Sequence, residues 1–280
     1  MYRLLASSSI AFALIFLAIQ TISIGSKVTV QSDSIQKGLL QAGRNCDREL
    51  ASILIARGAN PNLPSEAVQP LTRAIARFNL TINLPPDVHF YTTTSRLSKE
   101  QRRQKCLDFI NYFLENEADP NLLFTPPDGR VNEFTNVAPS AFFQAVNVNS
   151  GLPNTSNTQA IEALLNNGAN PNLGSLHEYK DLAIGSTPLM VIMKESQGSR
   201  SNVQKVWDIL LPISDVNLRN NDGETALMIL VQYDVGGQQF AVQRLLDAGA
   251  RTDIKNAEGL TALDIAISEG KTNIVKLLIQ

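Results

Sequence analysis

The chain has 280 residues and a mass of 30.6 kDa, of which 44% are hydrophobic and 18% charged. This composition supports a sizeable buried core and excludes an intrinsically disordered chain. The formal net charge is -2 and the lysines and arginines are scattered, so no basic stripe is available to neutralise a phosphate backbone. We therefore expect a folded protein that has no nucleic-acid partner.

The first segment of the chain is uncharged and apolar. Residues 4–26 follow Arg3, carry no charge and contain the strongly apolar run Ile10–Ile19. Such a run is typical of the hydrophobic part of a secretory signal and predicts a hydrophobic helix at the N-terminus. Export from the cytoplasm is the expectation that follows.

Two interpretations of this leader remain open. Small residues just before Ser26 suit cleavage of residues 1–26 as a signal peptide. Ile22 and Ile24 extend the apolar run toward the roughly 20 residues that cross a bilayer, which favours a retained anchor. The protein would then be either exported (periplasmic or extracellular) or tethered to a membrane that it contacts only through residues 4–26. Residues 27–33 read as a linker.

A short phrase recurs through the rest of the chain after stretches of helical apolar spacing, so each copy is predicted to close a helix. Glycine stands where the helix would end in a left-handed residue in three copies, and Glu117 replaces it in the second. The copies are ARGANPN (56–62), ENEADPN (115–121), NNGANPN (166–172), PISDVN (212–217) and DAGARTD (247–253).

A second phrase follows each copy of the first and is predicted to begin a helix. Thr187, Thr225 and Thr261 can cap free backbone amides, and Pro188 suits an early helical position. The repeating unit is therefore loop, helix, turn, helix. The copies are QPLTRAIA (69–76), APSAFFQAV (138–146), STPLMVIM (186–193), ETALMILV (224–231) and LTALDIAI (260–267).

The last of these units resembles an ankyrin repeat almost throughout, in the run NAEGLTALDIAISEGKTNIVKLLI (256–279), and the preceding unit resembles it closely. The resemblance extends over residues 34–280 and implies an all-α ankyrin-repeat solenoid of about six stacked helix pairs. It also implies binding of a protein partner through the concave side. The histidine that commonly follows Thr-Pro-Leu in the family is absent, and Thr72, Met190, Met228 and Asp264 stand at its position.

Long insertions separate this sequence from the family pattern. The final Asn or Asp of the first phrase recurs at intervals of 59, 51, 45 and 36 residues, against a usual period of about 33. Some insertions fall between the two helices of a unit, as at 79–98. Others lengthen the finger between units, at 122–137 and 173–186.

The lengthened fingers supply the candidate partner-binding residues, because aromatic and arginine side chains commonly anchor protein interfaces. The alternative is that the aromatic rings pack onto their own repeat. The candidates are Phe124, Arg130, Phe134, His177, Tyr179 and Lys180.

The two cysteines, Cys46 and Cys106, occupy nearly equivalent positions in adjacent units, 13 residues before Ala59 and 12 before Ala118. Stacked equivalent positions are usually farther apart than the roughly 4.4 to 6.8 Å between Cα atoms that a disulfide requires. A one-residue offset could close that gap. A disulfide and a pair of buried thiols therefore both remain open.

No constellation of residues predicts catalysis, a metal or a cofactor. The histidines are His89 and His177, without a HExxH or paired-cysteine motif. The Ser-x-x-Lys strings at 34–37 and 268–271 lack the partner motifs of exported serine enzymes. We expect a non-enzymatic scaffold. The alternatives are a tethered structural element that self-associates through the C-terminal repeat, and an enzyme or small-ligand protein built across the insertions that uses His177 with nearby acids.

Overall fold

The computed structural model describes residues 33–63, 69–81, 97–123, 140–146, 158–176, 178, 181–195, 201–233 and 239–279. The predicted leader at 1–26 and nearly all of the linker lie outside these residues. Every regular element in the described part is a helix, which confirms the all-α prediction.

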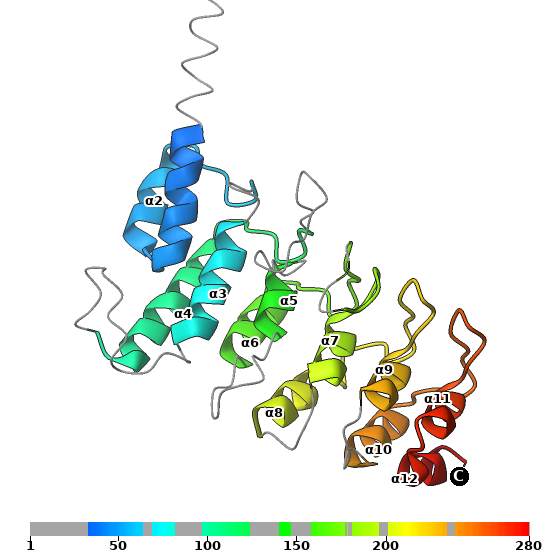
Figure 1. Cartoon of the computed structure of the whole chain (residues 1–280). Coiled ribbons are helices and arrows are strands. Elements are labelled where there is room, and N and C mark those ends of the chain that lie inside the picture. Colours follow the sequence, from blue (N-terminus) through cyan, green and yellow to red (C-terminus); the bar gives the residue numbers. More distant parts are fainter. Residues whose placement is uncertain are drawn as a thin grey trace, which may run out of the picture.

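The described helices follow one another in six successive pairs, stacked side by side (Figure 1). A helix over residues 33–45 pairs with α2. The helices after it are α2 (Arg48–Ala56), α3 (Pro70–Thr81), α4 (Lys99–Glu115), α5 (Ala141–Val146), α6 (Thr158–Asn166), α7 (Pro188–Glu195), α8 (Ser201–Leu210), α9 (Ala226–Gln232), α10 (Gln239–Asp247), α11 (Ala262–Ser268) and α12 (Thr272–Leu278).

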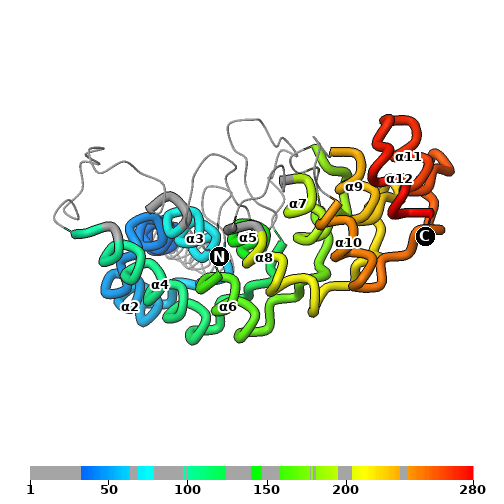
Figure 2. Tube along the Cα trace, turned by 90° about the horizontal axis from the view of Figure 1, so that it is seen from below, coloured from blue at the N-terminus to red at the C-terminus, as the bar shows by residue number. Residues whose placement is uncertain are grey.

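Contacts between the pairs follow two rows (Figure 2). The first helices form the row α3, α5, α7, α9, α11, and the second helices contact one another from α2 through α4 and α6 to α8, and again from α10 to α12. The core runs continuously along the stack. Its largest members include Phe109 and Phe113, whose ring centroids are 4.5 Å apart. Burying each such ring contributes about 1.5 to 3 kcal/mol.

The predicted threonine caps are confirmed. The hydroxyls of Thr187, Thr225 and Thr261 accept hydrogen bonds from the backbone N–H three residues ahead, at 3.4, 3.3 and 3.2 Å. Where the family histidine is missing, the substitutes supply other bonds. The Met190 sulfur accepts the Thr187 N–H at 3.4 Å, and the Asp264 carboxylate accepts the Thr261 N–H at 2.9 Å and its hydroxyl at 2.7 Å. These bonds lower the pKa of Asp264.

In four pairs the second helix is followed by a residue in the left-handed conformation. Gly58, Gly168 and Gly249 have φ of 92°, 82° and 88°. Glu117 takes the same conformation with φ of 64°, although a side chain at such a position costs about 1 kcal/mol or more relative to glycine. The backbone conformation is therefore retained where the glycine is lost.

The last asparagine of each first phrase ties one pair to the next. The Asn62 side chain donates to the Glu117 carbonyl at 2.8 Å and accepts the Asp119 N–H at 2.6 Å. Asn121 does the same to the Gly168 carbonyl and the Asn170 N–H, at 2.8 and 2.6 Å.

The series continues along the chain. Asn172 accepts the Asp215 N–H at 2.8 Å, and Asn217 bonds the Gly249 carbonyl and the Arg251 N–H at 3.0 and 2.8 Å. We call Asn62, Asn121, Asn172 and Asn217 the asparagine ladder. Gln36 fills the corresponding place before the first ladder residue, accepting the Asn60 N–H at 3.2 Å.

We predict that Asn121→Ala lowers the free energy of unfolding by about 1 to 2 kcal/mol, because it removes two hydrogen bonds between neighbouring pairs. Urea titration followed by circular dichroism measures the change. Asn167→Ala is the matched control, since Asn167 directly follows α6 and its side chain donates to the Ala163 carbonyl of that same helix at 2.8 Å. Equal losses in the two variants would contradict a role for Asn121 between pairs.

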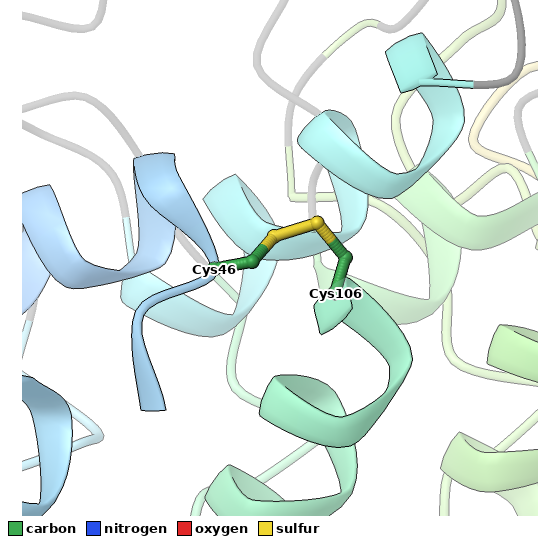
Figure 3. Close-up of a disulfide and its surroundings, with 2 residues drawn as sticks. All are labelled: Cys46 and Cys106. Carbon is green, nitrogen blue, oxygen red and sulfur yellow. A yellow bond between two sulfur atoms is a disulfide. The ribbon is translucent and has the colours of Figure 1, made fainter. Parts of the chain in front are cut away.

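A disulfide joins Cys46 to Cys106, whose Cα atoms are 4.8 Å apart (Figure 3). Cys46 lies in the turn before α2 with φ of 50°, whereas Cys106 lies inside the longer α4. Both residues are almost fully buried. The link fastens the first helix pair to the second across 60 residues of sequence.

We predict that Cys46→Ala with Cys106→Ala destabilises the first two pairs by about 4 kcal/mol, the chain-entropy value for a closed loop of this size. Urea unfolding with and without reductant measures it. Reductant should destabilise the wild-type chain and leave the double variant unchanged. A wild-type chain that releases two free thiols on unfolding without reductant would contradict the link.

Candidate functional site

The connections that precede α7, α9 and α11 project as hairpins from the same side of the stack (Figure 1). They cover residues 173–186, 218–225 and 254–261, and we call this side the hairpin edge. The first of the three is one of the two lengthened fingers predicted from the repeat intervals. Residues 177, 179 and 180 of this segment lie outside the described part.

An asparagine closes each of the two shorter hairpins. The Asn220 N–H donates to the Glu224 carbonyl at 3.1 Å, and its side-chain oxygen accepts the Asp222 and Glu224 N–H groups at 3.1 and 2.9 Å. Asn256 repeats the arrangement, with its side-chain oxygen accepting the Glu258 and Leu260 N–H groups at 3.1 and 2.9 Å. These local bonds give both hairpins a defined conformation.

The longer hairpin is closed by its backbone. The Ser175 N–H donates to the Ser186 carbonyl at 3.0 Å, and the Gly185 N–H to the Ser175 carbonyl at 2.8 Å. The two sides of the hairpin approach so closely at Gly174 that a Cβ there would lie 2.7 Å from the Gly185 carbonyl oxygen. A side chain at position 174 would force them apart.

Backbone bonds also join each hairpin to the next. The Asn221 N–H donates to the Ile184 carbonyl at 2.8 Å, and the Ala257 N–H donates to the Asp222 carbonyl at 2.8 Å. Arg219 adds a bond from its guanidinium to the Lys255 carbonyl at 2.9 Å. The three hairpins therefore form one connected surface.

Two apolar side chains of the longer hairpin face outward. Leu176 is 51% exposed and Ile184 is 40% exposed, whereas Leu182 between them is buried. The hairpin backbone is hydrogen-bonded on both sides of Ile184. Little conformational entropy is therefore lost when a partner binds to this segment. Exposed aliphatic side chains on an ordered hairpin suit contact with another protein.

The longer hairpin also reaches the far end of α7. The Asp181 carboxylate accepts a hydrogen bond from the Lys194 ammonium at 3.2 Å, and that ammonium lies 4.4 Å from the centroid of the Tyr233 ring. Asp181 has φ of 55°, a left-handed conformation that aspartate tolerates better than most residues. The Asp181 side chain is almost fully exposed, so this ion pair marks where the hairpin approaches α7 and contributes little stability.

The six candidate binding residues taken from the sequence are untested. Phe124, Arg130, Phe134, His177, Tyr179 and Lys180 all lie outside the described residues. The described part of the finger at 173–186 contains Leu176, Asp181 and Ile184, which the sequence analysis does not single out. The only sequence signal for these residues is that they are apolar or charged and lie within an insertion. Which of them face outward depends on the pairing of the hairpin.

Two other features are absent from the described residues. No group of three His, Cys, Asp or Glu within them could hold a metal ion. No helix in this part of the chain is long and apolar enough to cross a bilayer. The exposed Arg251 and Asp253 form an ion pair at 2.6 Å that raises the pKa of the arginine and lowers that of the aspartate, which is a structural role.

Comparison with known proteins gives the same family along different parts of the chain. The family model "Ankyrin repeats (3 copies)" matches residues 198–280. "Putative ankyrin repeat protein FPV031" of Fowlpox virus (strain NVSL) is 31% identical over 125 residues, which are 43% of this chain and 33% of that protein. The chain thus spans about a third of that relative's length.

Solved structures extend the likeness to most of the chain. "Crystal Structure of EF0377 an Ankyrin Repeat Protein" has a TM-score of 0.56 at 20% identity and covers 88% of this chain and 98% of its own. A chain of "Bd0816 Predatory Endopeptidase from Bdellovibrio bacteriovorus in complex with immunity protein Bd3460" has a TM-score of 0.52 at 21% identity, covering 86% and 96%.

Residues 198–280 therefore match ankyrin repeats, and most of the chain has the ankyrin-repeat fold.

Proposed function

We propose that this protein is an extracytoplasmic ankyrin-repeat scaffold that binds another protein through its hairpin edge. Ankyrin repeats serve generally as scaffolds for protein interaction, and this supports a binding role. The observation that carries the proposal is the outward exposure of Leu176 and Ile184 on a hairpin held by backbone hydrogen bonds.

Location outside the cytoplasm has two supports. Residues 4–26 have the uncharged, apolar character of a signal or anchor. The bond between Cys46 and Cys106 is of a kind that persists in oxidising compartments and is rare in the cytosol. A soluble exported form and a form tethered through the leader are both consistent with these features.

We predict that Leu176→Ala with Ile184→Ala weakens binding of the native partner by about 30-fold, since loss of two apolar contacts removes about 2 kcal/mol. The partner is first isolated on the tagged wild-type chain from its own cells, identified, and then titrated against each variant by calorimetry.

Ile53→Ala with Phe240→Ala is the matched control, because these side chains are 50% and 63% exposed but lie on helices. It should bind as the wild type does. Weakening by the control alone would move the interface to the helices. The absence of any stoichiometric partner from cells that export the chain would count against the binding function itself.

Self-association is a second candidate, favoured by Ile267 and Ile279, which are 59% and 65% exposed on the last pair. For this candidate we expect a concentration-dependent mass in analytical ultracentrifugation that Ile267→Glu abolishes. A monomer at all concentrations would exclude it.

A further inference from the structure

Ile184, one of the two exposed apolar side chains of the hairpin edge, lies in a tight turn. The Ser186 N–H donates to the Ala183 carbonyl at 3.1 Å, which closes a four-residue turn around Ile184 and Gly185. Gly185 has φ of 84°, a conformation that glycine adopts at little cost. The direction of the Ile184 side chain therefore depends on how this turn is held.

Two adjacent residues of the next hairpin hold the turn. The Asn221 N–H donates to the Ile184 carbonyl at 2.8 Å, and the Asn220 side-chain amide donates to the Ser186 hydroxyl at 3.3 Å. Ser186 and Asn220 are both buried, so loss of the second bond would leave polar groups without a partner. Together the two bonds fix the turn that carries Ile184.

Asn220 is itself fixed within its own hairpin. Its side-chain oxygen accepts the Asp222 and Glu224 N–H groups, and its amide also donates to the Glu224 carboxylate at 2.9 Å. Both ends of the amide are thus bonded within residues 220–224, while the amide nitrogen also reaches Ser186. The side chain therefore acts as a rigid link between the two hairpins.

Asn256 is the equivalent residue of the last hairpin and lacks this link. Its side-chain oxygen accepts the Glu258 and Leu260 N–H groups in the same way. Its amide nitrogen, however, donates to no other residue in the described part of the chain. Both asparagines close their own hairpin, but of the two only Asn220 also holds the hairpin before it.

We propose that Asn220 is a positioning residue for partner binding at the hairpin edge. This inference rests on the proposed binding function and names the residue that orients its apolar contact. Asn220 is buried and makes no direct contact with the partner. It holds residues 183–186 so that Ile184 faces outward before a partner arrives. Less conformational freedom is then lost on association, which raises the affinity.

Amide hydrogen exchange, measured by NMR on the full chain, tests the link without a partner. Asn220→Ala should speed exchange of the Gly185 and Asn221 amides at least about tenfold, because their hydrogen bonds open when the turn is released. Asn256→Ala is the matched control. It removes the same two acceptors from its own hairpin and should change these amides less than about twofold. Equal acceleration in the two variants would overturn the proposal.

The second readout is the affinity of the partner isolated on the tagged wild-type chain, measured by calorimetry. Asn220→Ala should weaken this partner at least about fivefold, and Asn256→Ala less than about twofold. In the Leu176→Ala/Ile184→Ala background, Asn220→Ala should weaken it less than about twofold further, since the side chain that it positions is already removed. A loss of the same size in both backgrounds would show that Asn220 acts elsewhere, and the positioning role would be wrong.

The positioning role and the binding function fail differently. If Leu176→Ala/Ile184→Ala weakens the partner and Asn220→Ala does not, the positioning role is wrong and the binding function stands. If neither variant weakens the partner, the hairpin edge is not the binding surface and both are wrong.

A second variant covers the case in which Asn220→Ala is misfolded by circular dichroism. Ser186→Ala removes only the acceptor of the link and leaves the other bonds of Asn220 in place. It should speed exchange of the Gly185 and Asn221 amides and weaken the partner. Unchanged exchange in a folded Ser186→Ala chain would contradict the link.

Discussion

The fold depends on contact between neighbouring helix pairs, because no pair can bury its apolar faces alone. Hydrophobic contact along the two rows of helices provides most of the stabilisation, but it is non-directional and does not fix how one pair is aligned with the next. The asparagine ladder fixes that alignment. Each ladder side chain accepts one N–H and three of the four are bonded to a carbonyl in the next turn, so the register between pairs is set by hydrogen-bond geometry.

This arrangement explains how the chain carries long insertions. A ladder residue and the turn that it contacts lie at one edge of the stack, and the residues between units can lengthen without altering either. The finger at 173–186 uses that freedom. It closes on itself at Gly174, bonds to the next hairpin through Ile184, and reaches Lys194 at the end of α7. The insertion thereby becomes an ordered surface.

The two ends of the array are stabilised differently. At the N-terminal side Gln36 substitutes for a ladder residue, and the covalent bond from Cys46 to Cys106 joins the first pair to the second. In the last pairs the hairpins stay short and close to the family pattern, with Asn220 and Asn256 closing them alike.

The sequence by itself determined the repeating helix pair, because its determinants are local. The threonine caps, the glycines that end helices and the apolar spacing act within a few residues, and each could be placed before the structure was considered. Local sequence preference fails at Glu117. Its left-handed conformation is imposed by the turn and by the hydrogen bond from Asn62 to its carbonyl, and not by its own preference.

Only the tertiary structure decided which side chains from different units meet. The spacing from the repeat motif reveals a one-residue offset between Cys46 and Cys106, but the structure shows that Cys46 lies in the turn before α2, that Cys106 lies inside α4, and that the two are bonded. The outward direction of Leu176 and Ile184 depends on the pairing of a hairpin, and the stacking of Arg103 on the Phe78 ring depends on how α3 packs on α4. These are contacts between residues far apart in sequence, and local propensity carries no information about them.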